Sequence, residues 1–261
     1  MRSLWVALGW SILMLGAAQT GVGVSPPRAV YTAQAGGTVQ GVVVVDHPGS
    51  SGPMRVTASL SDVLVQPDGE PVYLDPGSQP RSAATWLSYT PVEFVLEPKA
   101  TRAVSYTLHV PEDAADGTYW AVLFFDSGPV QEPKGGGIGV RMRVRVGHVV
   151  YVNVGRITRQ GRIEGVRYRP PGGRNPPQLR IKFHNTGNGL MRLNGRVELR
   201  DAEGRVVATG TVQNAAALPG PPYEIAAPLE KAPPPGRYVA LVRLDYGEPE
   251  VIVAEGEVEV P

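Results

Sequence analysis

Residues 111–126 read PEDAADGTYWAVLFFD, and residues 233–245 read PPPGRYVALVRLD. Both stretches begin with proline, continue with Gly-x-Tyr and end in an apolar run that an aspartate closes. A Gly-x-Tyr that opens a strand is typical of the tyrosine corner of a β-sandwich, where the phenol hydroxyl bonds the backbone just upstream. The repeat predicts two related sandwiches, with Tyr119 and Tyr238 in structural roles.

The rest of the chain alternates strand patterns with turn residues, and no long window has a helical period. In residues 102–110, for example, apolar and small polar side chains alternate, which predicts one buried and one solvated face. We therefore expect an all-β fold of two tandem immunoglobulin-like β-sandwich domains, at 24–155 and 162–261. The expected strands cover residues 28–32, 38–45, 54–65, 85–89, 92–96, 101–110, 118–125 and 138–154, then 162–169, 178–184, 193–200, 206–213, 223–229, 238–246 and 251–260.

The N-terminus has the pattern of a signal peptide, residues 1–18. Arg2 supplies a positive start, residues 4–15 are mostly apolar, and small residues at 16–18 suit a signal peptidase. The apolar run is shorter than the roughly 20 residues of a membrane span. We expect export to a periplasm or the cell surface, with no membrane span in the mature chain.

Composition removes several functional classes. The formal net charge is +1, too balanced for a surface that mainly binds nucleic acid or an anionic membrane. There is no cysteine, which excludes disulfides, thiolate metal sites and a cysteine nucleophile. None of the four histidines lies in a catalytic or metal-binding motif. We expect no enzyme activity, no cofactor and no metal. A glycan hydrolase would need paired carboxylates in a cleft, and the sequence cannot place such a pair.

Short motifs in both halves carry a family resemblance. They are Phe94-x-Leu96-x-Pro98 and Pro111-x-Asp113-Ala114-x-x-Gly117-x-Tyr119-Trp120 in the first half, and Phe183-His184-Asn185-Thr186-Gly187-Asn188, Asp201-x-x-Gly204-x-Val206 and Pro235-Gly236-x-Tyr238 in the second. With them the chain resembles the bacterial periplasmic chaperones of pilus assembly. It is also similar to two-domain immunoglobulin-like envelope proteins of Gram-positive surface systems. Sandwiches of this kind occur in proteins with many different binding functions, so the motifs predict the fold more specifically than the function.

The chaperone resemblance implies strand addition to an exported protein subunit or other envelope protein. An edge strand of the first domain would complete the partner's sheet, with backbone bonds giving affinity and alternate side chains filling its groove. Residues 138–146 have that pattern: one face carries Val140, Met142, Val144 and Val146, and the other carries arginines. The alternative is that this apolar face belongs to the domain's own core.

The same resemblance implies a basic pair near the domain cleft that holds the partner's terminal carboxylate. Arg28 matches the first position. No lysine lies between Lys134 and Lys182, so the second position must be an arginine, and Arg141 is the candidate. The functional alternative to a chaperone is a structural or adhesive envelope module that binds peptidoglycan, polysaccharide or a surface protein. The sequence leaves open the oligomeric state and whether the strand over 138–154 breaks at Gly147.

Overall fold

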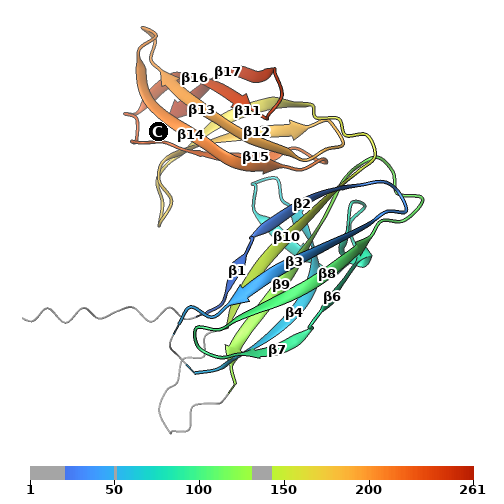
Figure 1. Cartoon of the computed structure of the whole chain (residues 1–261). Coiled ribbons are helices and arrows are strands. Elements are labelled where there is room, and N and C mark those ends of the chain that lie inside the picture. The colour runs from blue at the N-terminus through green and yellow to red at the C-terminus, as the bar shows by residue number, and fades with distance from the viewer. Residues whose placement is uncertain (1–20, 50–51, 131–142) are drawn as a thin grey trace, which may run out of the picture.

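The computed structural model describes residues 21–49, 52–130 and 143–261, and it confirms the predicted all-β fold of two sandwiches (Figure 1). Within those ranges a single 3-10 turn, η1 (Ala84–Trp86), accompanies the strands. The chain passes from the first sandwich to the second through residues 155–160. The predicted signal peptide lies outside the described residues.

The first sandwich consists of a four-stranded and a six-stranded sheet. The smaller sheet has the order β1 (Gly23–Ser25), β3 (Thr38–Asp46), β8 (Thr101–His109) and β6 (Leu87–Thr90). The larger has the order β2 (Arg28–Ala33), β10 (Val144–Val154), β9 (Gly117–Pro129) and β4 (Met54–Val65), with β5 (Pro71–Leu74) and β7 (Glu93–Leu96) both beside β4.

The second sandwich consists of a three-stranded and a four-stranded sheet. The first has the order β11 (Gly161–Arg169), β12 (Gln178–Asn185) and β15 (Tyr223–Pro228). The second has the order β14 (Val206–Ala217), β13 (Met191–Arg200), β16 (Gly236–Asp245) and β17 (Val251–Val260). Each sandwich encloses its own apolar core, because alternate side chains of the strands point between the two sheets.

Both Gly-x-Tyr motifs form corners in the structure. The Tyr119 hydroxyl donates to the Ala115 carbonyl at 3.1 Å, and the Tyr238 hydroxyl donates to the Pro234 carbonyl at 2.8 Å. The glycine that opens each motif has a positive φ, 142° and 154°, a backbone region that glycine enters without a steric penalty. The two corners hold the loop before β9 and the loop before β16 against their own strands.

Three details differ from the sequence-based expectation. The short strands β1 and β5 were not predicted, and Thr85 and Trp86 belong to η1 rather than to a strand. The structure also answers the question left open at Gly147: this residue pairs with Phe124, and β10 continues past it without a register shift. The inward and outward faces of β10 therefore stay the same along its whole length.

The central strand β9 is buried on both faces. Its odd-numbered residues from Tyr119 to Phe125 enter the core of the first sandwich. On the opposite face, Trp120 packs with Tyr151, Leu190 and Leu218, and the last two belong to the second domain. Backbone bonds join the domains at the same place, since Thr118 donates its N–H to the Asn188 carbonyl at 2.8 Å. The two sandwiches thus share a built apolar interface.

Candidate partner-binding edge and cleft

Over its first half the strand β10 has a free edge, one with no hydrogen-bonded strand, although β1 and Gly21 pass close to it. It pairs antiparallel with β9 along its whole length, from Val144 to Val154. On its other side it pairs parallel with β2, but that ladder begins only at Val149. Over Val144–His148, therefore, no strand of the described chain is hydrogen-bonded to the second edge of β10.

The direction of the backbone groups on this edge follows from two hydrogen bonds. Val149 donates its N–H to the Pro27 carbonyl, on the β2 side. The Val144 carbonyl accepts from the Ser127 hydroxyl, on the β9 side. Because backbone groups of alternate residues point to opposite edges of a strand, Arg145 and Gly147 direct their N–H and C=O groups to the free edge. These groups are what an added strand would bind.

The side chains around this edge divide into two faces. Val144 and Val146 are half-buried, and Val146 packs against the core of the first sandwich. On the outer face Arg145 holds Asp126 through two hydrogen bonds of 2.7 and 3.0 Å and lies over the Phe124 ring. The edge is therefore apolar towards the core and carries an ion pair on the outside. Val140, Arg141 and Met142 lie outside the described residues.

Two other strand edges, those of β17 and β11, carry charges that oppose pairing. The edge strand β17 presents Glu255, Glu257 and Glu259, all exposed on its outer face. The edge strand β11 carries Arg162, Glu164 and two further arginines in alternation with smaller residues. Charged side chains on an edge discourage the addition of another strand. Among these edges, that of β10 combines free backbone groups with apolar neighbours.

Arg28 lies at the start of β2, exposed and opposite Val149 of β10. Two residues on in the same register, Val30 lies opposite Tyr151. Paired residues of neighbouring strands share a face of the sheet, so Arg28, Val149 and Tyr151 all belong to the outer face that meets the second domain. This places Arg28 at the rim of the junction between the sandwiches.

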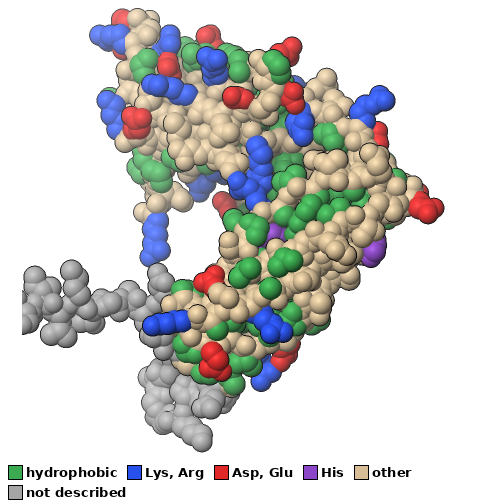
Figure 2. All heavy atoms as spheres, viewed as in Figure 1, with side chains coloured by type: hydrophobic (Ala, Val, Ile, Leu, Met, Phe, Trp, Pro, Cys, Tyr) green, Lys and Arg blue, Asp and Glu red, His purple; other side chains and the backbone are tan. Residues whose placement is uncertain are grey.

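Sequence reasoning missed Arg192, a second cation at this junction. It comes from β13 of the second domain, and its guanidinium lies 5.0 Å from the centre of the Tyr151 ring. Its Nη2 is buried and has no acceptor among the described residues. No local motif marks this arginine, because only the packing of the domains brings it to β10. Figure 2 shows several basic side chains gathered where the two sandwiches meet.

The domain interface also contains a cavity of about 380 Å³. Val63, Val65 and Trp120 line it from the first domain, and Leu218 and Tyr223 line it from the second. The polar groups of the two aromatic residues are used internally: the Trp120 indole donates to the Val63 carbonyl at 3.1 Å, and the Tyr223 hydroxyl donates to the Ala216 carbonyl. Gln79 and Arg81 add polar groups to the lining, so the cavity is of mixed character.

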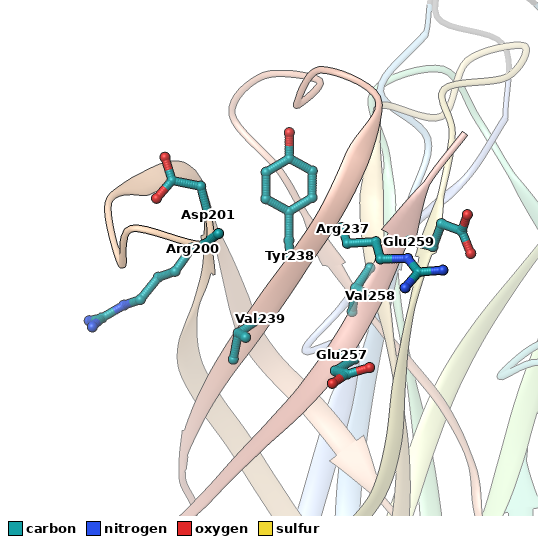
Figure 3. A pocket seen from close by; sticks show the side chains of 9 residues that line it. Arg200, Asp201, Arg237, Tyr238, Val239, Glu257, Val258 and Glu259 are labelled. Atoms are coloured by element: carbon teal, nitrogen blue, oxygen red, sulfur yellow. The ribbon is translucent and has the colours of Figure 1, made fainter.

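A larger hollow of about 540 Å³ lies on the second domain, around Val239 (Figure 3). Its charged residues do not converge: in Figure 3 the side chains of Arg200 and Arg237 extend to opposite sides, and the Tyr238 ring points towards its corner. In the described ranges, no group of three His, Asp or Glu residues could hold a metal ion. The described chain also contains no helix long and apolar enough to cross a membrane.

A buried polar chain lies behind the free edge. The His148 ring is fully buried, and its Nδ1 is 2.7 Å from the Pro26 carbonyl, which can only accept, so Nδ1 carries the proton. Nε2 then accepts from the Tyr106 hydroxyl at 3.0 Å, and Tyr106 accepts from Tyr31 at 2.8 Å. Burial lowers the pKa of His148 and raises that of Tyr106, so both remain neutral.

Comparison with known proteins gives a fold. No protein family and no curated protein matches this chain in sequence. Among solved structures, the chain is similar to one from a chaperone–tip adhesin complex of CFA/I fimbriae biogenesis, at 12% identity and a TM-score of 0.50, covering 92% of this chain and 99% of that one. Two others are the class 5 fimbriae chaperone CfaA, at 12% identity, TM-score 0.49 and coverage of 92% and 100%, and the SafB chaperone in complex with the SafA pilin of Salmonella enterica, at 13%, 0.45 and coverage of 92% and 98%.

The similarity to the first of these structures extends over nearly the whole of both chains. It therefore concerns the pair of sandwiches together and not one module. The fold of this protein is thus similar, over both sandwiches, to that of a chain from a chaperone–adhesin complex of fimbriae.

Proposed function

We propose that this protein is a non-enzymatic, exported chaperone of the pilus-assembly type, which works in the periplasm. It binds a subunit or another envelope polypeptide by adding the first half of β10 to the partner's sheet. The observation that carries the proposal is the free edge of Val144–His148, where β2 does not yet pair with β10. The two-domain fold supports the same role.

The chemistry of strand addition suits this edge. The N–H and C=O groups of Arg145 and Gly147 would form the backbone ladder, which gives affinity without regard to sequence. Val144 and Val146 lie on the face that would meet the apolar groove of the partner, where Val146 would exchange its packing against the domain's own core for contacts with the partner. Arg145, held by Asp126, would stay on the outer face and keep the free protein from pairing with itself.

The junction between the sandwiches would hold the partner's terminal carboxylate. Arg28 supplies one cation from β2, and Arg192 supplies the second from the other domain, where it rests on Tyr151. Arginine binds a carboxylate through two parallel N–H donors. The Nη2 atom of Arg192 is itself buried, so the carboxylate would reach the other N–H groups of this guanidinium. We assign to Arg192 the second basic position, for which the sequence had suggested Arg141.

Blocking the free edge should abolish partner capture. Arg145→Pro removes an N–H that points away from β9, so the internal ladder stays intact, and edge positions tolerate proline. The protein is purified from its native envelope, and co-purified polypeptides are quantified by mass spectrometry. We expect a stoichiometric exported polypeptide with the wild type and none with Arg145→Pro.

The control for this experiment is Arg145→Ala, which loses the same ion pair to Asp126 but keeps the N–H. It should retain the partner, and circular dichroism should be the same for all three proteins. Equal capture by the proline and alanine variants would refute strand addition at this edge. Recovery of glycan alone, or of no partner with the wild type, would indicate a structural or adhesive envelope module instead.

The carboxylate site makes a separate prediction. Removing one charged hydrogen-bonding group is worth about 1.5–3 kcal/mol, so Arg28→Ala and Arg192→Ala should each weaken binding of the purified partner about 10- to 100-fold. Isothermal titration calorimetry measures the change. Arg196→Ala, an exposed arginine on the same strand as Arg192, is the matched control and should change affinity little. A partner with an amidated C-terminus has no terminal carboxylate. If Arg192→Ala still weakened the binding of such a partner, Arg192 would bind some other group of the partner.

A further inference from the structure

The turn between β4 and β5 reaches out of the first sandwich and touches the second (Figure 1). Glu224 of β15 donates its N–H to the Pro67 carbonyl at 3.0 Å. The Arg180 guanidinium, from β12, donates to the Asp68 carbonyl. The turn is thus bonded through its backbone to two strands of the other domain.

The groups that receive the turn are themselves held in place. Arg180 is buried and also pairs with Glu224, at 3.2 Å. Arg167 donates two hydrogen bonds to the same carboxylate from the neighbouring strand. These arginines lower the pKa of Glu224, first through the hydrogen bond from Arg167. The second domain therefore meets the turn with hydrogen-bonded side chains, two arginines and one glutamate, that together carry one net positive charge.

Gly69 makes the close approach possible. Its φ is +84°, in the left-handed region that glycine favours, and a Cβ at this position would collide with the Glu224 carbonyl oxygen. A backbone carbonyl on β15 cannot give way without moving the strand, so any side chain here would push the domains apart. The contact requires glycine for space as well as for conformation.

A second attachment lies beside the linker. Thr118 donates its N–H to the Asn188 carbonyl, and its hydroxyl accepts from the Leu190 N–H at 2.8 Å. The Asn188 side chain in turn bonds the linker at Thr158 and Arg156. If the domains were attached only beside the linker, one domain could still rotate relative to the other about that point. A second attachment from another element prevents this rotation.

We propose that the turn around Gly69 is a positioning element, which fixes the angle between the two domains and so sets the separation of Arg28 and Arg192. The second half of this proposal rests on the proposed function, because it concerns the partner's carboxylate. The first half is a property of the free protein. The two can be measured separately.

The angle is measured on the free protein by electron–electron spin distances. The chain has no cysteine, so Ser105→Cys on the first domain and Glu255→Cys on the second give a unique and exposed label pair. We expect one narrow distance distribution for this background. Adding Gly69→Ala should shift and broaden it, because the added methyl group breaks the contact of the turn with β15.

Gly204→Ala is a matched control. Gly204 lies in the turn before β14 with φ +78°, so alanine suffers the same backbone strain, but nothing lies within 4 Å of the added methyl group. Its distance distribution should superimpose on that of the parent. If Gly69→Ala and Gly204→Ala gave the same distribution, the turn would not set the angle. Arg180→Met, which removes the contact to Asp68 without adding bulk, should broaden the distribution as Gly69→Ala does.

Binding of the co-purified polypeptide is the second readout. Coupling between sites is typically 5- to 150-fold, and we expect Gly69→Ala to weaken this binding about tenfold while Gly204→Ala does not. A changed angle with unchanged affinity would overturn the positioning role. Absence of any partner for the wild type would instead reject the proposed function. The distance measurements would still decide whether the turn fixes the angle between the domains.

Discussion

Trp120→Ala is expected to destabilise the protein by about 3–5 kcal/mol and to separate the unfolding of its two domains. The indole is buried at the interface, packs with Leu190 and Leu218 of the second domain, and donates to the Val63 carbonyl. Alanine leaves a cavity at the place where the domains meet and an unpaired carbonyl beside it. Calorimetry should show one transition for the wild type and two for the variant.

The control is Trp86→Ala, which removes the same side chain from the first sandwich alone. Trp86 packs on Tyr119 with ring centres 4.4 Å apart, and it contacts the first core. Its loss should lower the stability of the protein but keep a single transition. If Trp120→Ala also unfolded in a single transition, the domains would be coupled mainly by other contacts, of which the Gly69 turn is the first candidate.

The fold could be predicted because its signals are local. Alternation of apolar and polar residues marks a strand wherever one face is buried, as in β8, and turn residues mark its ends. The Gly-x-Tyr motif contains both residues that form the corner: the glycine allows the chain to turn, and the tyrosine hydroxyl bonds the backbone just upstream. The strands β1 and β5 escaped because each is short and lies beside proline and glycine residues that mark turns, whereas β6 and β7, which are as short as β5, were found.

The candidate site could be predicted only in part, because its defining features are not local. The residue types on β10 indicate an apolar face, but they do not say where the parallel pairing with β2 begins. That register, starting at Val149 opposite Arg28, is what leaves Val144–His148 with a free edge. Arg192 is further removed from any local pattern, since the domain interface alone brings it to Tyr151.

Acidification is expected to destabilise the protein through His148, close to the free edge. The pKa of His148 is lowered by burial from its ordinary value of 6.5, whereas the unfolded chain titrates near that value. Below about pH 6.5 the unfolded state therefore binds more protons than the folded state. The free energy of unfolding decreases as the pH is lowered. The fall ends at the folded-state pKa, below which both states are protonated. Each unit of pKa depression removes about 1.4 kcal/mol.

Denaturant unfolding as a function of pH separates this effect from that of the carboxylates. The pKa of Glu224 is lowered, so its contribution is lost at more acidic pH, below its ordinary value of 4.5. His148→Gln should flatten the slope just below pH 6.5, whereas His109→Gln, which changes an exposed ring beside Thr38, should leave it unchanged. If the free energy of unfolding of His148→Gln depended on pH as that of the wild type does, another group would cause the acid sensitivity. Protonation of His148 occurs at Nε2, so it would break the hydrogen bond that this atom accepts from the Tyr106 hydroxyl, whereas the donation from Nδ1 to the Pro26 carbonyl would remain.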